Sequence, residues 1–213
     1  MITAASNSRI KRLVQLNQKS KLRRTEDVFL AEGVKMFLEA PRKQLQEVYV
    51  SESFLEKCSC REHLEEVGYE VVSDSVFSKI SDTCTPQGVL CVLKQFHYNI
   101  EEMLRDKAPL FLLLENIQDP GNLGTMLRTG EGAGVSGIIM SRDTVDLYNP
   151  KVIRSTMGSI YRVPFYYADD FAAAVHQVQQ AGVSVYAAHL RGKNSYACQD
   201  YTKGTAFLIG NEG

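Results

Sequence analysis

The sequence predicts an α/β fold with a largely parallel sheet in its second half, and two observations support this prediction. Short apolar segments alternate with helix-forming segments along the chain, an order typical of α/β layers. In the second half the apolar runs are continuous rather than alternating, as in "LFLLLENI" (110–117), and such strands are covered on both faces of a sheet. With 213 residues, 44% of them hydrophobic, the chain can bury the core that this fold requires.

Residues 1–96 are predicted to form a first α/β unit. Asn7 caps a helix that runs to residue 24, because apolar residues recur there at roughly helical spacing. The expected strands are 28–33, 45–51, 69–73 and 88–96. The expected helices are 34–40, which stops before Pro41, a short one between the second and third strands, and 73–81.

A polar, charged linker is predicted at 97–107, followed by a second α/β unit at 108–213. Its expected strands are 110–117, 137–141, 183–190 and 205–213. Its expected helices are one after Pro120, one around 149–160, and one at 169–182 that ends at a glycine. The last strand runs into "GNEG" at the edge where α/β folds place ligand-binding loops, so we expect the natural protein to continue beyond Gly213.

Basic residues cluster at the amino-terminal end. The whole chain has a net charge of −1, yet residues 1–24 contain seven Lys or Arg and no Asp or Glu. A basic segment on an acidic remainder favours contact with phosphates, and the competing interpretation is a solvated helix face.

Cysteine spacing and hydropathy bound the class of protein. The five cysteines are irregularly spaced, which favours reduced thiols in the cytoplasm. Cys58, Cys60 and His63 lack an evident fourth ligand for structural zinc, so we expect no metal site. No apolar stretch approaches the ~20 residues that span a bilayer, and no signal peptide is apparent, so we expect no membrane association.

The glycines at 132, 134 and 137 spell G-x-G-x-x-G, the dinucleotide-binding fingerprint. That fingerprint follows a strand and opens a helix, whereas here it closes a helix and precedes the strand at 137–141. A dinucleotide loop is therefore rejected. The signature motifs of P-loop NTPases, zinc proteases and α/β-hydrolases are also missing from the sequence.

Arg128 lies on the helix that follows the first strand of the second unit. Gly124 precedes it by one helical turn on the same stripe and has no side chain, so a ligand could approach the backbone there. Asn122 stands at the helix entrance, where it can cap or orient. The competing interpretation is a surface arginine paired with Glu131 or Asp119.

Three segments in order resemble the motifs of SpoU-type RNA ribose 2′-O-methyltransferases of the SPOUT superfamily: "LENIQDPGNLGTMLRTGEGAGV", "DLYNPKVIRSTMGSIYRVPF" and "FLIGNEG". The matching positions are Pro120, Asn122, Gly124, Arg128 and Thr129 in the first, Asn149, Pro150, Lys151, Arg154, Thr156 and Gly158 in the second, and Leu208, Gly210, Glu212 and Gly213 in the third. The first unit is similar to the substrate-binding domain of that family in "SNSRIKRLVQL", "FLAEGVKMFLEA" and "DTCTPQGVLCVL".

The resemblance implies a ribosomal-protein-like α/β substrate-binding domain and a SPOUT methylase domain. It implies methyl transfer from S-adenosylmethionine to a ribose 2′-hydroxyl of structured RNA, with ribosomal RNA as the expected substrate and tRNA as a second possible substrate. In the family a segment beyond the third motif completes a trefoil knot, the cofactor pocket and the dimer surface, so we expect the knot to be incomplete at Gly213 and a homodimer where that segment is present. Two competing hypotheses are an RNA-binding module without catalysis and an enzyme that methylates a base rather than a ribose.

The resemblance also implies the site residues. Asn122, Arg128 and Glu212 are the expected catalytic residues. The role of Arg128 stays open between a base and an anchor for phosphate and alkoxide, and the anchor is favoured because a guanidinium does not normally accept a proton. The residues expected at the cofactor are Leu190, Gly192, Ile209, Gly210 and Asn211.

Contacts with RNA are expected from basic residues of the amino-terminal helix and from the second motif. These residues are Arg9, Lys11, Arg12, Arg23, Arg24, Arg154 and Ser155. For Arg154 and Ser155 the competing interpretation is surface pairing and helix capping.

Overall fold

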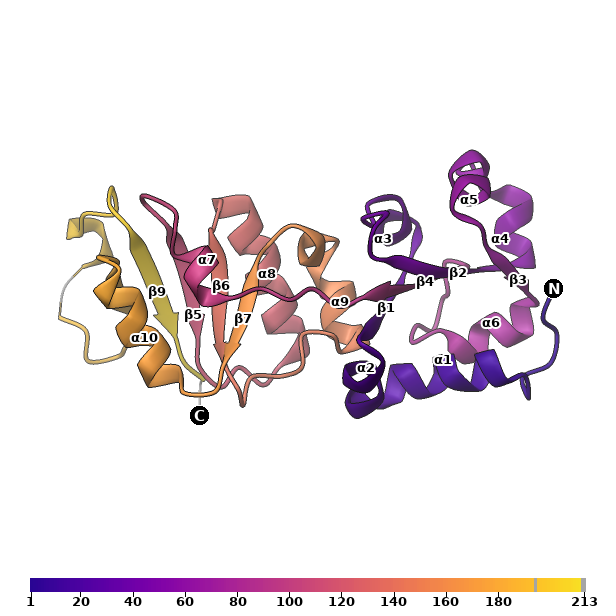
Figure 1. Ribbon diagram of the computed structural model, residues 1–213, viewed down its shortest axis with the longest axis horizontal. Coiled ribbons are helices and arrows are strands. Elements are labelled where there is room, and N and C mark those ends of the chain that lie inside the picture. The colour runs from indigo at the N-terminus through magenta and orange to yellow at the C-terminus, as the bar shows by residue number, and fades with distance from the viewer. Residues whose placement is uncertain (194, 212–213) are drawn as a thin grey trace. The chain divides into compact units, whose positions relative to one another are not determined.

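The chain folds into two compact units in the computed structural model, which describes residues 1–193 and 195–211 (Figure 1). The first unit comprises residues 1–96 and 146–161, and the second comprises 97–145 and 162–213. The segment 146–161, which contains most of the second motif, therefore packs with the first unit rather than with the strands on either side of it in the sequence.

A four-stranded sheet forms the centre of the first unit, in the order β1-β4-β2-β3. Strands β1 (Val28–Glu32), β4 (Val89–Lys94) and β2 (Leu45–Ser51) are antiparallel neighbours, and β3 (Glu70–Val72) runs parallel to β2. All four lie within the predicted strand segments.

One face of this sheet is covered by α1 (Ser8–Gln18) and α6 (Asp74–Ile80). Asn7 caps α1 as predicted, because its side-chain oxygen accepts a hydrogen bond from the Arg9 amide at 2.9 Å. The predicted single helix to residue 24 is wrong in one respect: the extended backbone of Lys19 separates α1 from α2 (Ser20–Glu26).

The opposite face carries α3 (Val34–Leu38) and α9 (Pro150–Thr156), which both contact β1. The ring of Tyr148, just before α9, packs on Phe29 with centroids 4.9 Å apart. The 3₁₀ turn Ser159–Tyr161 follows α9. Two short helices rather than one connect β2 to β3, namely α4 (Glu52–Lys57) and α5 (Arg61–Val67).

A buried ion pair attaches segment 146–161 to the first unit. Arg23 is 2% exposed, and its guanidinium donates to Asp146 Oδ2 at 2.6 Å and to the Leu16 carbonyl at 2.7 Å. Its Nε atom is buried without a hydrogen-bond partner among the described residues. A buried charge of this kind is tolerated only while its partner is present, because desolvation is not otherwise offset.

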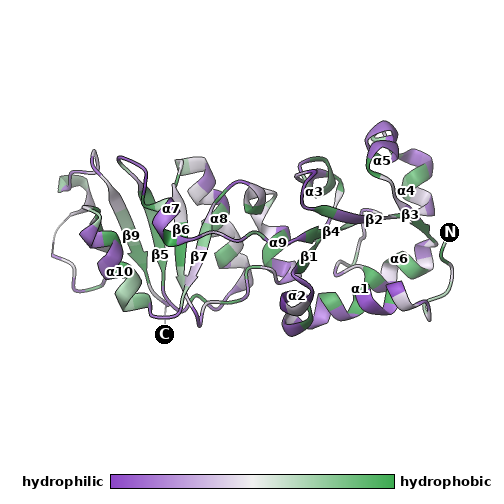
Figure 2. Ribbon diagram, in the orientation of Figure 1, coloured by the Kyte–Doolittle hydropathy of each residue, from purple (hydrophilic) through white to green (hydrophobic). Residues whose placement is uncertain are grey.

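The second unit has a five-stranded parallel sheet in the order β7-β6-β5-β9-β8. The strands are β7 (Phe165–Ala168), β6 (Gly137–Ser141), β5 (Leu110–Leu114), β9 (Thr205–Ile209) and β8 (Ser184–Ala187). This confirms the predicted parallel sheet, to which β7 is an addition that the sequence did not mark as a separate strand. Figure 2 shows the hydrophobic residues concentrated in β5 and β6.

Helices cover both faces of this sheet, as continuous apolar strands require. Helices α7 (Ile100–Met103) and α10 (Phe171–Gln180) form one core with alternate residues of β5 and β6. Helix α8 (Pro120–Ala133) packs on the other face, where Gly130 lies against Leu112. The predicted linker 97–107 thus contains α7 and belongs to the second unit. A short 3₁₀ turn, Tyr196–Cys198, precedes β9.

The G-x-G-x-x-G segment is a helix exit, as predicted. Gly134 ends α8 in a left-handed conformation with φ 74°. Gly137 begins β6 where a Cβ would clash with the end of the Met103 side chain. These two glycines serve a tight connection between helix and strand, and neither opens a helix toward a phosphate.

The Arg23–Asp146 pair is expected to be worth far more than an exposed pair. Asp146→Ala should lower the free energy of unfolding by about 3 kcal/mol, because it leaves a buried guanidinium without its counter-charge. Glu70→Ala is the matched control, since Glu70 pairs with Arg9 where the side chains are 46% and 58% exposed, and it should cost much less. Urea unfolding measures both, and equal losses would contradict the assignment.

Candidate active site

The strand order of the second unit marks where a ligand binds. From β5 the chain adds β6 and β7 on one side and later adds β8 and β9 on the other. The connections therefore diverge between β5 and β9, and open parallel sheets bind ligands in the crevice beyond the carboxyl ends of strands at such a point.

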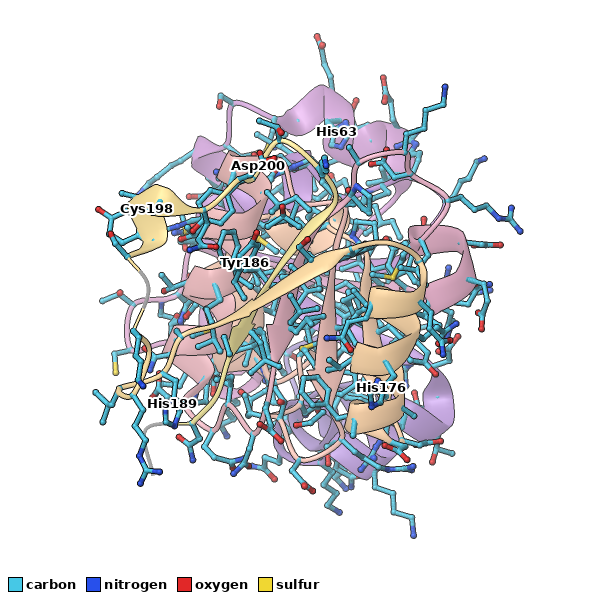
Figure 3. All side chains as sticks on the ribbon, turned by 90° about the vertical axis from the view of Figure 1, so that its left-hand side faces the viewer. His63, His176, Tyr186, His189, Cys198 and Asp200 are labelled. Carbon is cyan, nitrogen blue, oxygen red and sulfur yellow. The ribbon has the colours of Figure 1, made fainter. Side chains whose placement is uncertain are left out.

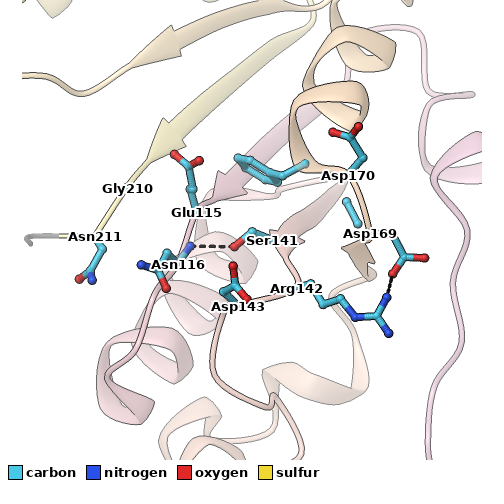
Figure 4. A pocket seen from close by; sticks show the side chains of 11 residues that line it. Glu115, Asn116, Ser141, Arg142, Asp143, Asp169, Asp170, Gly210 and Asn211 are labelled. Atoms are coloured by element: carbon cyan, nitrogen blue, oxygen red, sulfur yellow. Dashed lines mark hydrogen bonds and ion pairs between the residues drawn. The ribbon is translucent and has the colours of Figure 1, made fainter.

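A pocket of about 760 Å³ lies at this edge (Figure 4). Its walls come from the residues that follow β5, β6, β7 and β9. They are Glu115, Asn116, Ser141, Arg142, Asp143, Ala168, Asp169, Asp170, Phe171, Gly210 and Asn211. The predicted cofactor residues Gly210 and Asn211 thus line a real cavity, together with polar residues from three other strands.

The pocket is acidic. Carboxylates of Glu115, Asp143, Asp169 and Asp170 stand against one cation in the described lining, Arg142, which pairs with Asp169. Carboxylates accept hydrogen bonds from hydroxyl and ammonium groups. The lining therefore suits a ligand that carries such donors and does not suit a bare phosphate.

Two buried hydroxyls hold the loop that follows β5. Ser141 Oγ accepts a hydrogen bond from the Asn116 amide at 2.8 Å, and Thr144 Oγ1 accepts from the Ile117 amide at 3.3 Å. Asn116 has a left-handed backbone, with φ 55°, that few non-glycine residues adopt. The loop is thereby fixed at the point where the chain turns toward α8.

Helix α8 begins with a cap and presents the predicted catalytic residues. Asp119 Oδ1 accepts from the Asn122 amide at 2.7 Å, and Pro120 occupies the first turn. Asn122 is exposed in this turn, and Arg128 is exposed about 9 Å farther along the helix axis at ~1.5 Å per residue.

Arg128 does not form the surface pair that would make it an ordinary helix charge. Glu131 pairs with Arg162, and Asp119 caps the helix. In the part of the chain that the structure describes, the Arg128 guanidinium has no hydrogen bond or ion pair. The open approach predicted at Gly124 is wrong, however, because Gly124 is buried on the core side of α8.

The remaining predicted cofactor residues lie at the same sheet edge but outside the pocket lining. Ile209 ends β9. Leu190 is fully exposed, and the Gly192 amide donates to the His189 carbonyl at 2.9 Å. Both residues follow β8, in the segment to which His189, labelled in Figure 3, belongs. Glu212, the third predicted catalytic residue, lies outside the described residues.

The basic amino-terminal segment is only partly available to RNA. The expectation for Arg23 is wrong, because its guanidinium is buried against Asp146. Arg9 pairs with Glu70, and Arg12 pairs with Glu26 and Glu47. Two further predicted residues, Lys11 and Arg24, are exposed and make no ion pair with the described residues.

Arg154 forms a surface ion pair, and Ser155 forms a hydrogen bond within its helix. These are the contacts of the competing interpretation, in which neither residue binds RNA. The Arg154 guanidinium lies 3.1 Å from Asp82 Oδ2, within the first unit. The Ser155 hydroxyl donates to the Lys151 carbonyl one turn earlier in α9, at 2.9 Å. Arg154 remains 44% exposed at its side chain, so the ion pair does not bury it.

Most of the pocket residues were not predicted from the sequence. Glu115, Ser141, Asp143 and Asp169 belong to no matched motif position, although each ends an apolar strand or follows it by one or two residues. That position was the available signal, because the carboxyl ends of parallel strands converge at one edge.

The described residues form no metal site. Across 1–193 and 195–211, no three or more His, Cys, Asp or Glu residues are grouped so that they could hold a metal ion. The five cysteines are free thiols, and burial raises the pKa of Cys91. Among the described helices, none has the length and apolar character that crossing a membrane would require.

Known proteins match both units. Residues 109–213 match the model of the SpoU rRNA Methylase family, and residues 7–91 match the MRM3-like substrate binding domain. The chain is 31% identical over 215 residues to the 23S rRNA (guanosine(2553)-2′-O)-methyltransferase RlmP of Bacillus subtilis, covering 100% of this chain and 82% of that protein. It is 26% identical over 180 residues to the 23S rRNA (guanosine-2′-O-)-methyltransferase RlmB of Neisseria meningitidis, covering 80% and 72%.

A solved structure shows the same fold. The AdoMet-bound rRNA methyltransferase from Sinorhizobium meliloti superposes with a TM-score of 0.83 at 29% identity, covering 99% of this chain and 80% of that one. Fold and sequence thus agree along nearly the whole chain. The chain therefore belongs to the SpoU rRNA methylase family and is an RNA methyltransferase, as its three ordered motifs predict.

Proposed function

We propose that this protein transfers the methyl group of S-adenosylmethionine to a ribose 2′-hydroxyl of ribosomal RNA. The observation that carries the proposal is the polar pocket at the β5/β9 edge, in the unit that matches the methylase family and beside the helix that bears Asn122 and Arg128. The relatives from B. subtilis and N. meningitidis are 23S rRNA 2′-O-methyltransferases, and the S. meliloti structure holds AdoMet.

The residues of the pocket fit S-adenosylmethionine. When bound, S-adenosylmethionine supplies a methyl group on a sulfonium centre. The sulfur is a good leaving group that requires no metal. Glu115 and Asp169 offer carboxylate acceptors for hydroxyl and ammonium donors, and the Asn211 amide can both donate and accept. At Gly210 an added Cβ would meet no atom of the described residues within 4 Å, so the backbone there is open to a ligand. Leu190, Gly192 and Ile209 complete the proposed cofactor edge.

Arg128 is proposed to bind the RNA and stabilise charge on the attacking oxygen. A guanidinium presents N–H donors and no acceptor, so exposed Arg128 serves better as an anchor for phosphate or alkoxide than as a base. Asn122, on the first turn of the same helix, is proposed to orient the ribose or Arg128, and Glu212 to assist beside them. Lys11 and Arg24 supply sequence-independent phosphate contacts.

The direct experiment uses in vitro transcribed 23S rRNA, with 16S rRNA and tRNA transcripts as comparators. Methyl transfer from labelled S-adenosylmethionine should occur on 23S rRNA and leave one phosphodiester resistant to alkaline hydrolysis, because the reacting hydroxyl is blocked. A base-methylated product would stay alkali-sensitive and would overturn the ribose assignment. Binding of a transcript with no heat of S-adenosylmethionine binding in calorimetry would instead favour an RNA-binding module without catalysis.

We also propose that the protein acts in the cytoplasm and that, where a segment beyond the third motif is present, it forms a trefoil knot and a homodimer. The support is the resemblance of its motifs to those of SpoU-type enzymes. In that family a segment beyond the third motif supplies the knot and the dimer surface. Light scattering on the protein with such a segment present tests the dimer, and a monomeric mass at micromolar concentration would refute it.

Arg128→Ala should lower methyl transfer by about 10²- to 10³-fold, the size of effect typical of a lost oxyanion-stabilising donor. S-Adenosylmethionine affinity should stay unchanged by calorimetry, because Arg128 does not line the pocket. Arg105→Ala removes another exposed arginine of the second unit and should leave activity intact. Wild-type turnover in Arg128→Ala would exclude the catalytic role.

Gly210→Val should fill the cofactor edge and raise the Kd for S-adenosylmethionine about tenfold or more, a loss of at least ~1.4 kcal/mol. Folding should be unaffected, since the new side chain meets open space. Gly132→Val is the matched control, because a Cβ at Gly132 also meets nothing and Gly132 is not part of the pocket lining. Calorimetry compares the two, and unchanged binding in Gly210→Val would place the cofactor elsewhere.

A further inference from the structure

The loop that leads into α8, residues 115–119, is held by hydrogen bonds to neighbouring segments. Each residue from 115 to 119 makes at least one hydrogen bond through its backbone or side chain. The Glu115 amide donates to the Ile209 carbonyl at 2.9 Å, and the Val145 amide donates to the Ile117 carbonyl at 2.9 Å. The Gln118 side-chain amide donates to the Asp143 carbonyl at 2.6 Å. Hydrogen bonds to the loop after β6 therefore hold the loop after β5 in its conformation.

Two hydroxyls, one at the end of β6 and one in the loop after it, accept the central hydrogen bonds from the loop after β5. Ser141 and Thr144 are 7% and 5% exposed, and their hydroxyl oxygens lie 3.2 Å apart. Each accepts from one amide of the opposite loop, Ser141 from Asn116 and Thr144 from Ile117. Buried amide groups left without an acceptor are costly, so these two bonds select the loop conformation.

The left-handed backbone of Asn116 shows what the hydroxyls hold in place. This conformation is costly for a side chain that is not glycine, and it persists only where the surroundings impose it. It turns the chain so that Asp119 can cap α8 three residues later. The position of the first turn of α8, and with it Asn122, thus depends on contacts made at 116 and 117.

We propose that Ser141 and Thr144 are positioning residues for methyl transfer, which set the placement of Asn122 and Arg128 through the loop 115–119. This rests on the proposed function. Neither hydroxyl needs to touch the RNA. Displacing a catalytic group by about 1 Å can cost about 100-fold in rate, so a small shift of α8 has a large effect on turnover.

Thr144→Val is the sharpest variant, because it keeps the size and branching of the side chain and removes only the hydroxyl. Thr144 does not line the pocket, so S-adenosylmethionine affinity should be unchanged by calorimetry. The kcat on 23S rRNA transcript should fall about 10- to 100-fold with little change in KM. Hydrogen exchange at the Ile117 amide should accelerate, and Thr144→Ser, which restores the oxygen, should recover most of the activity.

Thr205→Val is the matched control for a purely structural effect. Thr205 is 2% exposed, lies at the opposite end of the same sheet, and donates to the Lys203 carbonyl at 2.8 Å. It should lower the melting temperature as much as Thr144→Val does while leaving kcat intact. An equal loss of kcat in both variants would reduce Thr144 to a stability residue and overturn the proposal.

A double-variant test links the hydroxyl to the helix. If Thr144 acts through Arg128, Thr144→Val should cost much less in the background of Arg128→Lys than in the wild type. Fully multiplicative losses would overturn the route through Arg128. Inactivity of the wild type on all transcripts would instead refute the proposed function, whereas an active wild type with an equally active Thr144→Val refutes only the positioning role.

Discussion

A parallel sheet with helices on both faces leaves its carboxyl edge as the place for polar chemistry, and the second unit is organised by that constraint. Its strands are apolar on both sides because α7 and α10 cover one face and α8 covers the other. Polar side chains that cannot enter the sheet gather where β5, β6, β7 and β9 end. Helix α8 starts at the same edge, so the polar pocket and the helix of the first motif lie at the ends of the same strands.

Hydrogen bonds between neighbouring segments then fix the loop after β5 at this edge. The loop after β5 cannot bury its amides unless the loop after β6 supplies acceptors, and Ser141 and Thr144 do so. The cost of the left-handed Asn116 is offset by these bonds. Arg128 is left without a protein partner among the described residues, which is the state expected of a group whose partner is the substrate.

In the first unit a buried ion pair joins two distant parts of the chain. Arg23 and Asp146 are 123 residues apart in sequence, and their ion pair helps bring segment 146–161 onto the face of the sheet that carries α3. The second motif is thereby built into the unit that matches the substrate-binding domain. Asn149 caps α9 and Arg154 pairs with Asp82, so local chemistry and tertiary contact agree on where this helix lies.

The sequence by itself determined the strands other than β7, most of the helices and the family. Continuous apolar runs mark β5, β6 and β9 because burial on both faces leaves no polar alternation, and three ordered motifs are specific enough to identify the enzyme class. Only the tertiary structure decided which charges are free. In the sequence Arg23 is one more cation in a basic run, and only the fold pairs it with Asp146. Glu115, Ser141 and Asp169 form one site only because parallel strands bring their carboxyl ends together. Ion pairs between distant residues and the convergence of strand ends are non-local, so no short segment of the sequence reveals them.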